Sequence, residues 1–226
     1  MKTVDELRFK IIDTNKTILA IETSSSICSA SLFKNGENIG VLENDTDRKH
    51  AEVLPDYVVS LLENNQLKIK NIDAIAVSIG PGSFTGLRVG LSFAKGLAYA
   101  IKCPIIPVPT ILAMAYSLRS KKPLNGIIRS HGEKIFFQEF IWDKKVPSVK
   151  DKPVLGNIHN YLDKVIGGFH FNCEEFLINA GNIYSAKPSA KDIAKLANIF
   201  FQKWNIPKPY KLTSEYMYPY VIKSND

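Results

Sequence analysis

The segment "SIGPGSFTGLRVG", residues 78–90, constrains the fold of this chain more than any other feature. It follows the apolar run "IDAIAVSI", which is typical of a buried strand, and it begins a helical pattern that extends to about Ile101. A strand, a glycine-rich turn and a helix in this order are also the layout of a phosphate-binding loop. The segment therefore predicts two successive elements, and it raises the question of whether the turn between them binds a nucleotide.

The order of predicted elements around this segment occurs twice. In the first half, "ILAIETSSS" and "ICSASLFKNGENIGVLEN" predict three antiparallel strands with a hairpin at Asn35–Gly36, and "HAEVLPDYVVSLLENN" predicts a helix. In the second half, a hairpin in "GIIRS" and "KIFFQEFIW" precedes a third strand in "VPSVKDKPVL", a helix in "NIHNYLDKVI", a strand in "EFLINAG" and an amphipathic helix in "SAKDIAKLANIFFQKW". The repeated order predicts two related α/β lobes, although the halves share negligible sequence identity.

The chain is expected to divide into three parts. Residues 1–17 form a polar N-terminal leader, residues 18–115 the first lobe, and residues 116–226 the second lobe. The stretch "KKPLNG", residues 121–126, is the best candidate for the linker between the lobes.

Composition favours a cytoplasmic protein. The N-terminus lacks the apolar region of a signal peptide, and no segment is long and apolar enough to span a membrane. The three cysteines are isolated, which predicts neither disulfides nor a zinc site. The net charge of +7 comes entirely from residues 103–226, which hold 17 Lys and Arg against 10 Asp and Glu. This asymmetry indicates either a half that faces a polyanion or a lysine-rich solvated surface.

The glycine turn fails both phosphate-binding signatures. No lysine follows a glycine at the spacing of a Walker loop, and Thr85 occupies the position of the third glycine in a dinucleotide fingerprint. A helix N-terminus with free backbone amides can still bind an anion. The candidates for a nucleotide or anion contact are therefore Glu22, Gly82, Ser83 and Thr85.

The helix after the turn offers another explanation for its glycines. Small side chains recur every four residues on one face, at Gly86, Gly90, Ala94 and Ala98. Glycine within a helix costs about 1 kcal/mol relative to alanine, so it is usually kept where another backbone comes close. This helix and the preceding one also carry surplus apolar faces, which favours a subunit interface over a deep core. We therefore expect Gly90→Leu to abolish pairing while leaving the monomer folded.

Catalytic groups are scarce in the sequence. Glu22 is the one acid placed where a two-lobed phosphotransferase keeps a metal-binding carboxylate, and the corresponding strand of the second half reads "IIRS". The four histidines include no H-x-x-x-H pair, and no nucleophile–base pair can be assembled for a peptidase. We expect no catalytic residues and no metal site. The alternative is an ATP-dependent small-molecule kinase, which would need a second acid across a cleft.

Four segments together resemble the bacterial TsaB family. They are "ILAIETSSSICSASL", "RKHAEVLPDYVVSLL", "GPGSFTGLRVGLSFAKGLAYA" and "PVPTILAMA", and they run in one order from Ile18 to about Ala115. Past Ala115 the resemblance is weak: "IRSHGE" keeps only Gly132 and Glu133 of the family's segment, and "EYMYPYVIK" is a loose counterpart of its C-terminal motif. The N-terminal leader is extra.

The resemblance implies an α/β, two-lobed actin-like ATPase (ribonuclease H-like) fold with a degenerate second lobe. It implies a non-catalytic partner of a TsaD-type subunit in the synthesis of threonylcarbamoyladenosine in tRNA, beside the anticodon. The pair is expected to recruit a TsaE-type ATPase, and the chain is expected to form a homodimer through the same two N-terminal helices when alone. The residues expected to face the partner are His50, Val53, Tyr57, Gly86, Arg88, Gly90, Phe93, Ala94 and Leu97.

Two differences from related catalytic subunits also indicate a non-catalytic chain. Those subunits hold a metal through a histidine pair, whereas here Leu54 stands four residues after His50. The acid of the opening strand, usually Asp in the family, is Glu22 here. The resemblance therefore implies no cofactor of the chain's own, with ATP expected only in the assembled complex. Transfer RNA itself is a further candidate partner, through the basic second half.

Overall fold

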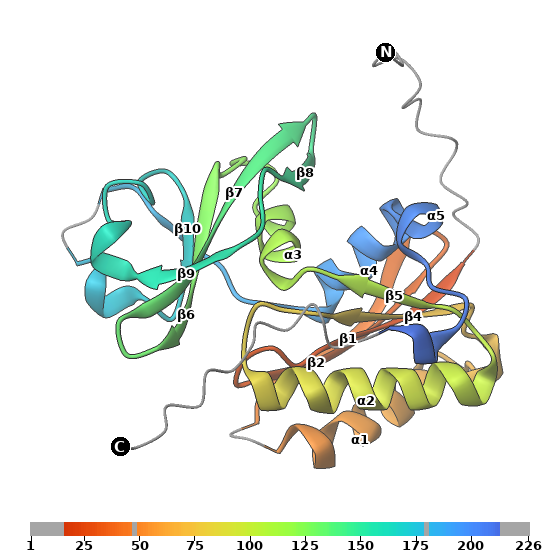
Figure 1. The fold of residues 1–226 in the computed structure, drawn as a ribbon. Helices are drawn as coiled ribbons and strands as arrows, with labels where there is room; N and C mark the ends of the chain where they lie inside the picture. The colour runs from red at the N-terminus through yellow and green to blue at the C-terminus, as the bar shows by residue number, and fades with distance from the viewer. Residues whose placement is uncertain (1–15, 47–48, 179–180, 213–226) are drawn as a thin grey trace.

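A computed structural model describes residues 16–46, 49–178 and 181–212 of the 226-residue chain. It contains two β-sheets, one in each half of the chain, with α1 and α2 beneath the first sheet and α3 and α4 above it (Figure 1). The predicted leader lies outside the described residues except for Lys16 and Thr17, and the C-terminal "EYMYPYVIK" lies outside them entirely.

The first sheet has the strand order β3-β2-β1-β4-β5. Strands β1, β2 and β3 pair antiparallel, and β1, β4 and β5 pair parallel. This arrangement confirms the three antiparallel strands and the strand–turn–helix–strand order predicted from the sequence. The strands are β1 (Thr17–Glu22), β2 (Ile27–Lys34), β3 (Glu37–Asp45), β4 (Ala74–Ser78) and β5 (Ile105–Val108).

Both faces of the first sheet are covered, which explains why β1 and β4 are continuous apolar runs. Leu19 and Ile21 of β1 point into the core formed with α1 (His50–Asn64) and α2 (Phe84–Ile101). Ile18 and Ala20 point to the opposite face, into the core formed with α3 (Thr110–Ser117) and α4 (Ala190–Ile199). The period-two alternation of the strand therefore assigns each helix pair to its own layer.

The second sheet repeats the first. Its order is β11-β10-β6-β7-β8, with β9 also paired to β7. As in the first sheet, an antiparallel β6–β7 pair adjoins strands β10 and β11 that run parallel to β6. The repeated order confirms the two-lobed ribonuclease H-like fold. The strands are β6 (Asn125–His131), β7 (Lys134–Asp143), β8 (Val146–Val149), β9 (Val154–Asn157), β10 (Phe169–Phe171) and β11 (Tyr184–Ser185).

In the part of the second lobe that the structure describes, no helices correspond to α1 and α2. The helix predicted in "NIHNYLDKVI" is wrong, because only Ile158–Asn160 form a 3₁₀ turn there. The strand predicted in "EFLINAG" is also wrong for its described residues, because Glu174–Phe176 form another 3₁₀ turn and Leu177 and Ile178 belong to no strand. Asn179 and Ala180 lie outside the described residues. Gly167 follows the first of these segments at a positive φ of 75°, a conformation that ends regular structure. The apolar pattern before it is too short to sustain a helix without tertiary support.

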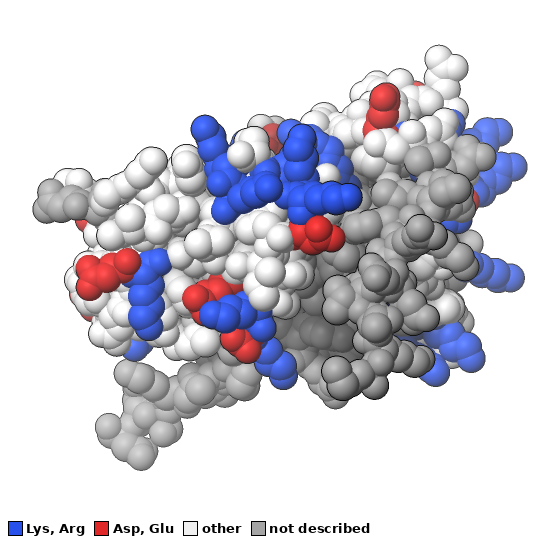
Figure 2. Space-filling view, turned by 90° about the horizontal axis from the view of Figure 1, so that it is seen from above, with Lys and Arg blue, Asp and Glu red and all other residues white. Residues whose placement is uncertain are grey.

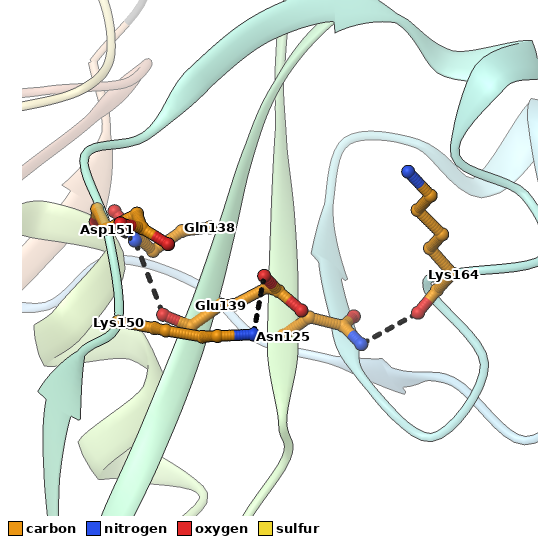
Figure 3. Close-up of polar contacts among 6 residues, drawn as sticks. All are labelled: Asn125, Gln138, Glu139, Lys150, Asp151 and Lys164. Carbon is orange, nitrogen blue, oxygen red and sulfur yellow. Dashed lines mark hydrogen bonds and ion pairs between the residues drawn. The ribbon is translucent and has the colours of Figure 1, made fainter.

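Side-chain hydrogen bonds hold the second sheet to the loops that replace these helices (Figure 3). The buried Asn125 amide donates to the Lys164 carbonyl at 2.7 Å, and the Gln138 amide donates to the Asp151 carbonyl at 2.5 Å. Buried amides with such partners stabilise the fold, whereas removing the partner costs about 1–3 kcal/mol. The degenerate lobe is thus held by specific polar contacts.

Helix α4 belongs to the second half of the chain but packs on the first sheet. Its segment lies within the expected second lobe, residues 116–226, yet α4 packs against β1 and β2 of the first sheet. The Ala190 amide donates to the Ser29 hydroxyl at 3.0 Å, and Lys187 pairs with Glu43 at 2.8 Å. The amphipathic pattern predicts the helix correctly, but it does not state which sheet the apolar face covers. Within the described residues, no helix is long and apolar enough to cross a membrane.

Candidate protein-interaction site

The glycine turn between β4 and α2 packs directly on the turn that follows β1. The Ser83 amide donates to the Ser24 carbonyl at 2.6 Å, and the Ser83 hydroxyl accepts from the Gly86 amide at 3.2 Å, which caps α2. Two amides at the candidate anion site are therefore already bonded within the chain. Of the other candidates, Gly82 sits half-buried against Ser24.

Three glycines allow this close approach. A side-chain carbon added at Gly82, Gly86 or Gly90 would lie closer than 3.0 Å to an atom of Ser24 or Thr23. At Gly82 and Gly86 the obstructing atom is a backbone carbonyl oxygen, which has no freedom to rotate away. The Thr23 hydroxyl donates to the Gly86 carbonyl at 2.8 Å and fixes the contact. The glycines thus lock α2 onto the end of β1.

The stripe of small residues therefore faces the chain's own sheet. Gly86, Gly90, Ala94 and Ala98 are all buried in the isolated chain. This burial argues against the prediction that Gly86, Gly90 and Ala94 face a partner. Because a carbon added at Gly90 would collide with Thr23, we expect Gly90→Leu to destabilise the monomer rather than leave it folded. A four-residue period of small side chains indicates that another backbone comes close, but not whether that backbone belongs to the same chain.

The outward surface of α1 and α2 is open to solvent, unlike the buried stripe of small residues. A hollow of about 430 Å³ lies between the two helices. Arg88 stacks on Phe84, with its guanidinium carbon 3.7 Å from the ring centre. Further along α1, Val59 is 53% exposed. We call this surface the α1–α2 face; it consists of Val59 and the residues that line the hollow, Ala51, Leu54, Arg88, Val89, Ser92 and Phe93.

The structure places the other predicted contact residues in several environments. Arg88 and Phe93 lie on the α1–α2 face. Val53, Tyr57 and Leu97 are half-buried. His50 is buried at the start of α1, where its Nε2 atom has no hydrogen-bond partner. Whether these residues contact a partner stays a prediction.

Five residues of the face are absent from the predicted contacts, namely Ala51, Leu54, Val59, Val89 and Ser92. On α2, Arg88 and Ser92 lie one helical turn apart, and so do Val89 and Phe93. The polar residues Arg88 and Ser92 mark the outward side of this nearly all-apolar helix, so the apolar residues beside them could have been identified. The pairing of that side with Ala51 of α1 depends on tertiary packing.

Glu22 ends β1 in a closed environment. Its side chain is 0% exposed, and one carboxyl oxygen accepts from the Ser24 amide at 2.5 Å. The other oxygen, Oε2, has no hydrogen-bond partner. Desolvation by burial raises the pKa of Glu22 to about 7, although hydrogen bonds from Ser24 and Ser78 lower it. Within the described residues, no three His, Cys, Asp or Glu side chains lie close enough together to hold a metal ion.

The raised pKa of Glu22 predicts a stability that falls with rising pH. The folded chain keeps the proton up to about pH 7, whereas the unfolded chain loses it near pH 4.5. Stability is therefore lost as the pH rises between these values, by up to about 3 kcal/mol, and Glu22→Gln removes this loss. Urea denaturation at pH 5 and pH 8 should show that Glu22→Gln stabilises the chain more at pH 8. Equal effects at both pH values would contradict a buried, protonated carboxyl.

Comparison with known proteins places the chain in a family. The family model "TsaD: tRNA N6-adenosine threonylcarbamoyltransferase" matches residues 22–137, which is just over half of the chain. A Haemophilus influenzae protein named tRNA threonylcarbamoyladenosine biosynthesis protein TsaB is 33% identical over 133 residues, covering 58% of this chain and 56% of its own. A Buchnera aphidicola protein of the same name is 29% identical over 161 residues, covering 67% of this chain and 70% of its own.

A Staphylococcus epidermidis tRNA N6-adenosine threonylcarbamoyltransferase is 32% identical over 185 residues, covering 70% of this chain and 54% of its own. The chain thus spans between 54% and 70% of the length of these relatives.

Two solved structures from Pseudomonas aeruginosa share the fold. The structure titled "YeaZ" has a TM-score of 0.74 at 20% identity and covers 91% of this chain and 100% of its own. An uncharacterized protein with similarity to peptidase YeaZ has a TM-score of 0.76 at 21% identity and covers 87% and 97%. At this identity the two structures show the fold, whereas the family model and the relatives named TsaB show the family. The chain belongs to the TsaB family, within the wider group that the TsaD model describes.

Proposed function

We propose that this chain is a non-catalytic subunit in the synthesis of threonylcarbamoyladenosine in tRNA. It pairs with a TsaD-type catalytic subunit through the α1–α2 face. The observation that carries the proposal is this face itself, in a chain whose relatives are named for that pathway. Apolar side chains of both helices, including the half-buried Val89 and Phe93, surround an open hollow. Covering apolar surface of this kind with a partner lowers the free energy.

The surroundings of Glu22 support a non-catalytic role. Its carboxyl group is sealed from solvent, and burial favours its uncharged form. A phosphotransferase of two related lobes would carry a second carboxylate near the end of β6. That position holds Arg129, which pairs with Glu175 at 2.8 Å. A cation there opposes the binding of a metal ion.

The same proposal covers the other members of the assembly. A TsaE-type ATPase joins the pair, and ATP acts in the assembled complex rather than on this chain alone. Without the catalytic subunit, two copies of the chain associate through the α1–α2 face. The second copy and the catalytic subunit would then compete for the α1–α2 face, so that adding the catalytic subunit dissociates the homodimer.

Affinity purification of the tagged chain from its native cell tests the proposal. We expect TsaD-type and TsaE-type proteins to co-purify, and the reconstituted mixture to modify tRNA only when this chain is present. The isolated chain is the control, and it should neither modify tRNA nor turn over Mg-ATP. Turnover of Mg-ATP by the isolated chain would instead favour the small-molecule kinase. Full tRNA modification without the chain would refute the proposed role.

A further inference from the structure

A group of cations surrounds one buried acid on the upper side of the first sheet. Asp192 of α4 is 5% exposed, and Arg119, Lys191 and Lys195 act on it electrostatically. Lys191 and Lys195 lie one helical turn apart on α4, and Arg119 follows the end of α3, which packs against α4. We call Arg119, Lys191 and Lys195 the basic cluster.

The cations of the basic cluster are close enough to repel one another. Burial lowers the pKa of Lys195, and the positive charges of Arg119 and Lys191 lower it further, against the opposing effect of Asp192. Burial also raises the pKa of Asp192, although the charges of Lys195, Lys191 and Arg119 oppose this rise. Three cations held around one desolvated acid leave a net positive field, which an external anion would relieve.

Aromatic rings support the cations of this region. The guanidinium of Arg119 lies 4.9 Å from the ring centre of Tyr116 and donates to the Tyr116 carbonyl at 3.3 Å. Lys121, in the turn after α3, lies 5.9 Å from the ring centre of Tyr184. Such contacts restrict the side chains before a ligand arrives and reduce the entropy lost on binding.

The basic cluster lies on the opposite side of the sheet from the proposed partner surface. Ile18 and Ala20 of β1 pack in the core of α4, whereas Leu19 and Ile21 pack in the core of α1 and α2. The packing of α3 and α4 on this upper side places the basic cluster there, and Figure 2 shows that Lys and Arg side chains are exposed on the same side. A subunit bound to the α1–α2 face would therefore leave the basic cluster accessible.

We propose that the basic cluster, with Lys121 beside it, binds the phosphate backbone of RNA. Closely spaced lysine and arginine side chains are the groups that neutralise backbone phosphates and release their counterions. Residues 103–226 hold 17 Lys and Arg against 10 Asp and Glu. This excess of positive charge attracts a polyanion to this half of the chain. The identity of the RNA as tRNA rests on the proposed function.

The salt dependence of RNA binding tests this inference. The double variant Lys191→Gln with Lys195→Gln removes two cations of the basic cluster. Lys68→Gln with Lys70→Gln removes two exposed cations beyond α1 and serves as the matched control. Fluorescence anisotropy with labelled tRNA measures affinity from 50 to 200 mM salt, for the chain alone and for its complex with the TsaD-type subunit. Urea denaturation checks that all variants fold.

We expect the basic-cluster variant to bind tRNA on the order of tenfold more weakly, and its slope of log affinity against log salt to fall by about two. The control pair should change neither value. Unchanged affinity and slope in the basic-cluster variant would overturn the inference. If the chain binds tRNA in this way but fails to pair with the catalytic subunit, the proposed pairing falls and this inference stands.

Discussion

Gly86→Ala is expected to destabilise the chain by about 2 kcal/mol, even though alanine is the better helix former. The added carbon would meet the Thr23 carbonyl oxygen at less than 3.0 Å, and backbone atoms on both sides prevent relief by rotation. Moving α2 outward would break the bond from the Thr23 hydroxyl to the Gly86 carbonyl. Urea denaturation followed by circular dichroism measures the change in the free energy of unfolding.

Gly96→Ala on the same helix is the matched control. An added carbon at Gly96 meets nothing within 4 Å, so this substitution should stabilise the chain by about 1 kcal/mol. The two variants are chemically identical and should shift stability in opposite directions. If Gly86→Ala were as stable as Gly96→Ala, the close packing of α2 on Thr23 would be refuted.

Val59→Glu is expected to weaken pairing with the TsaD-type subunit by at least about 30-fold. The side chain is 53% exposed on the outward side of α1, so the isolated chain should accommodate a charge there without loss of stability. In the proposed complex the carboxylate would be buried without a partner, which costs about 2–5 kcal/mol. Isothermal titration calorimetry gives the dissociation constant of each variant.

Val154→Glu is the matched control for pairing. Val154 is 49% exposed, but it lies on β9 of the second lobe. This variant should pair with the catalytic subunit as tightly as the unmodified chain. Equal weakening by both substitutions would indicate a general effect of charge, and no weakening by Val59→Glu would place the partner elsewhere.

The first lobe was predictable because its local signals agree. Alternating or continuous apolar runs, the Asn35–Gly36 turn and the glycine-rich segment each predict one element, and the structure contains all of them. The second lobe lacks this agreement. Its sheet is held by the buried amides of Asn125 and Gln138, whose partners are distant loop carbonyls. No local sequence pattern reveals such contacts.

The candidate site was predictable only in part. The sequence correctly indicates that α2 is apolar on more than one side, and Arg88 and Phe93 lie on its outward face. The sequence does not show whether a glycine makes room for a partner or for another part of the same chain. At Gly86 and Gly90 the neighbour is Thr23 of the same chain. That distinction depends on the three-dimensional path of the turn after β1. Closure over Glu22 likewise arises only when this turn and the glycine turn meet.

Chemical labelling of the α1–α2 face tests the central claim most directly. The three native cysteines are buried, so a thiol introduced by Val59→Cys or Val154→Cys is the reactive group in each variant. The rate of alkylation is measured with and without saturating TsaD-type subunit, after gel filtration has established that the complex forms. We predict that the partner slows alkylation at least tenfold in Val59→Cys and leaves Val154→Cys unchanged. An unchanged rate in the Val59→Cys variant within a formed complex would contradict the account.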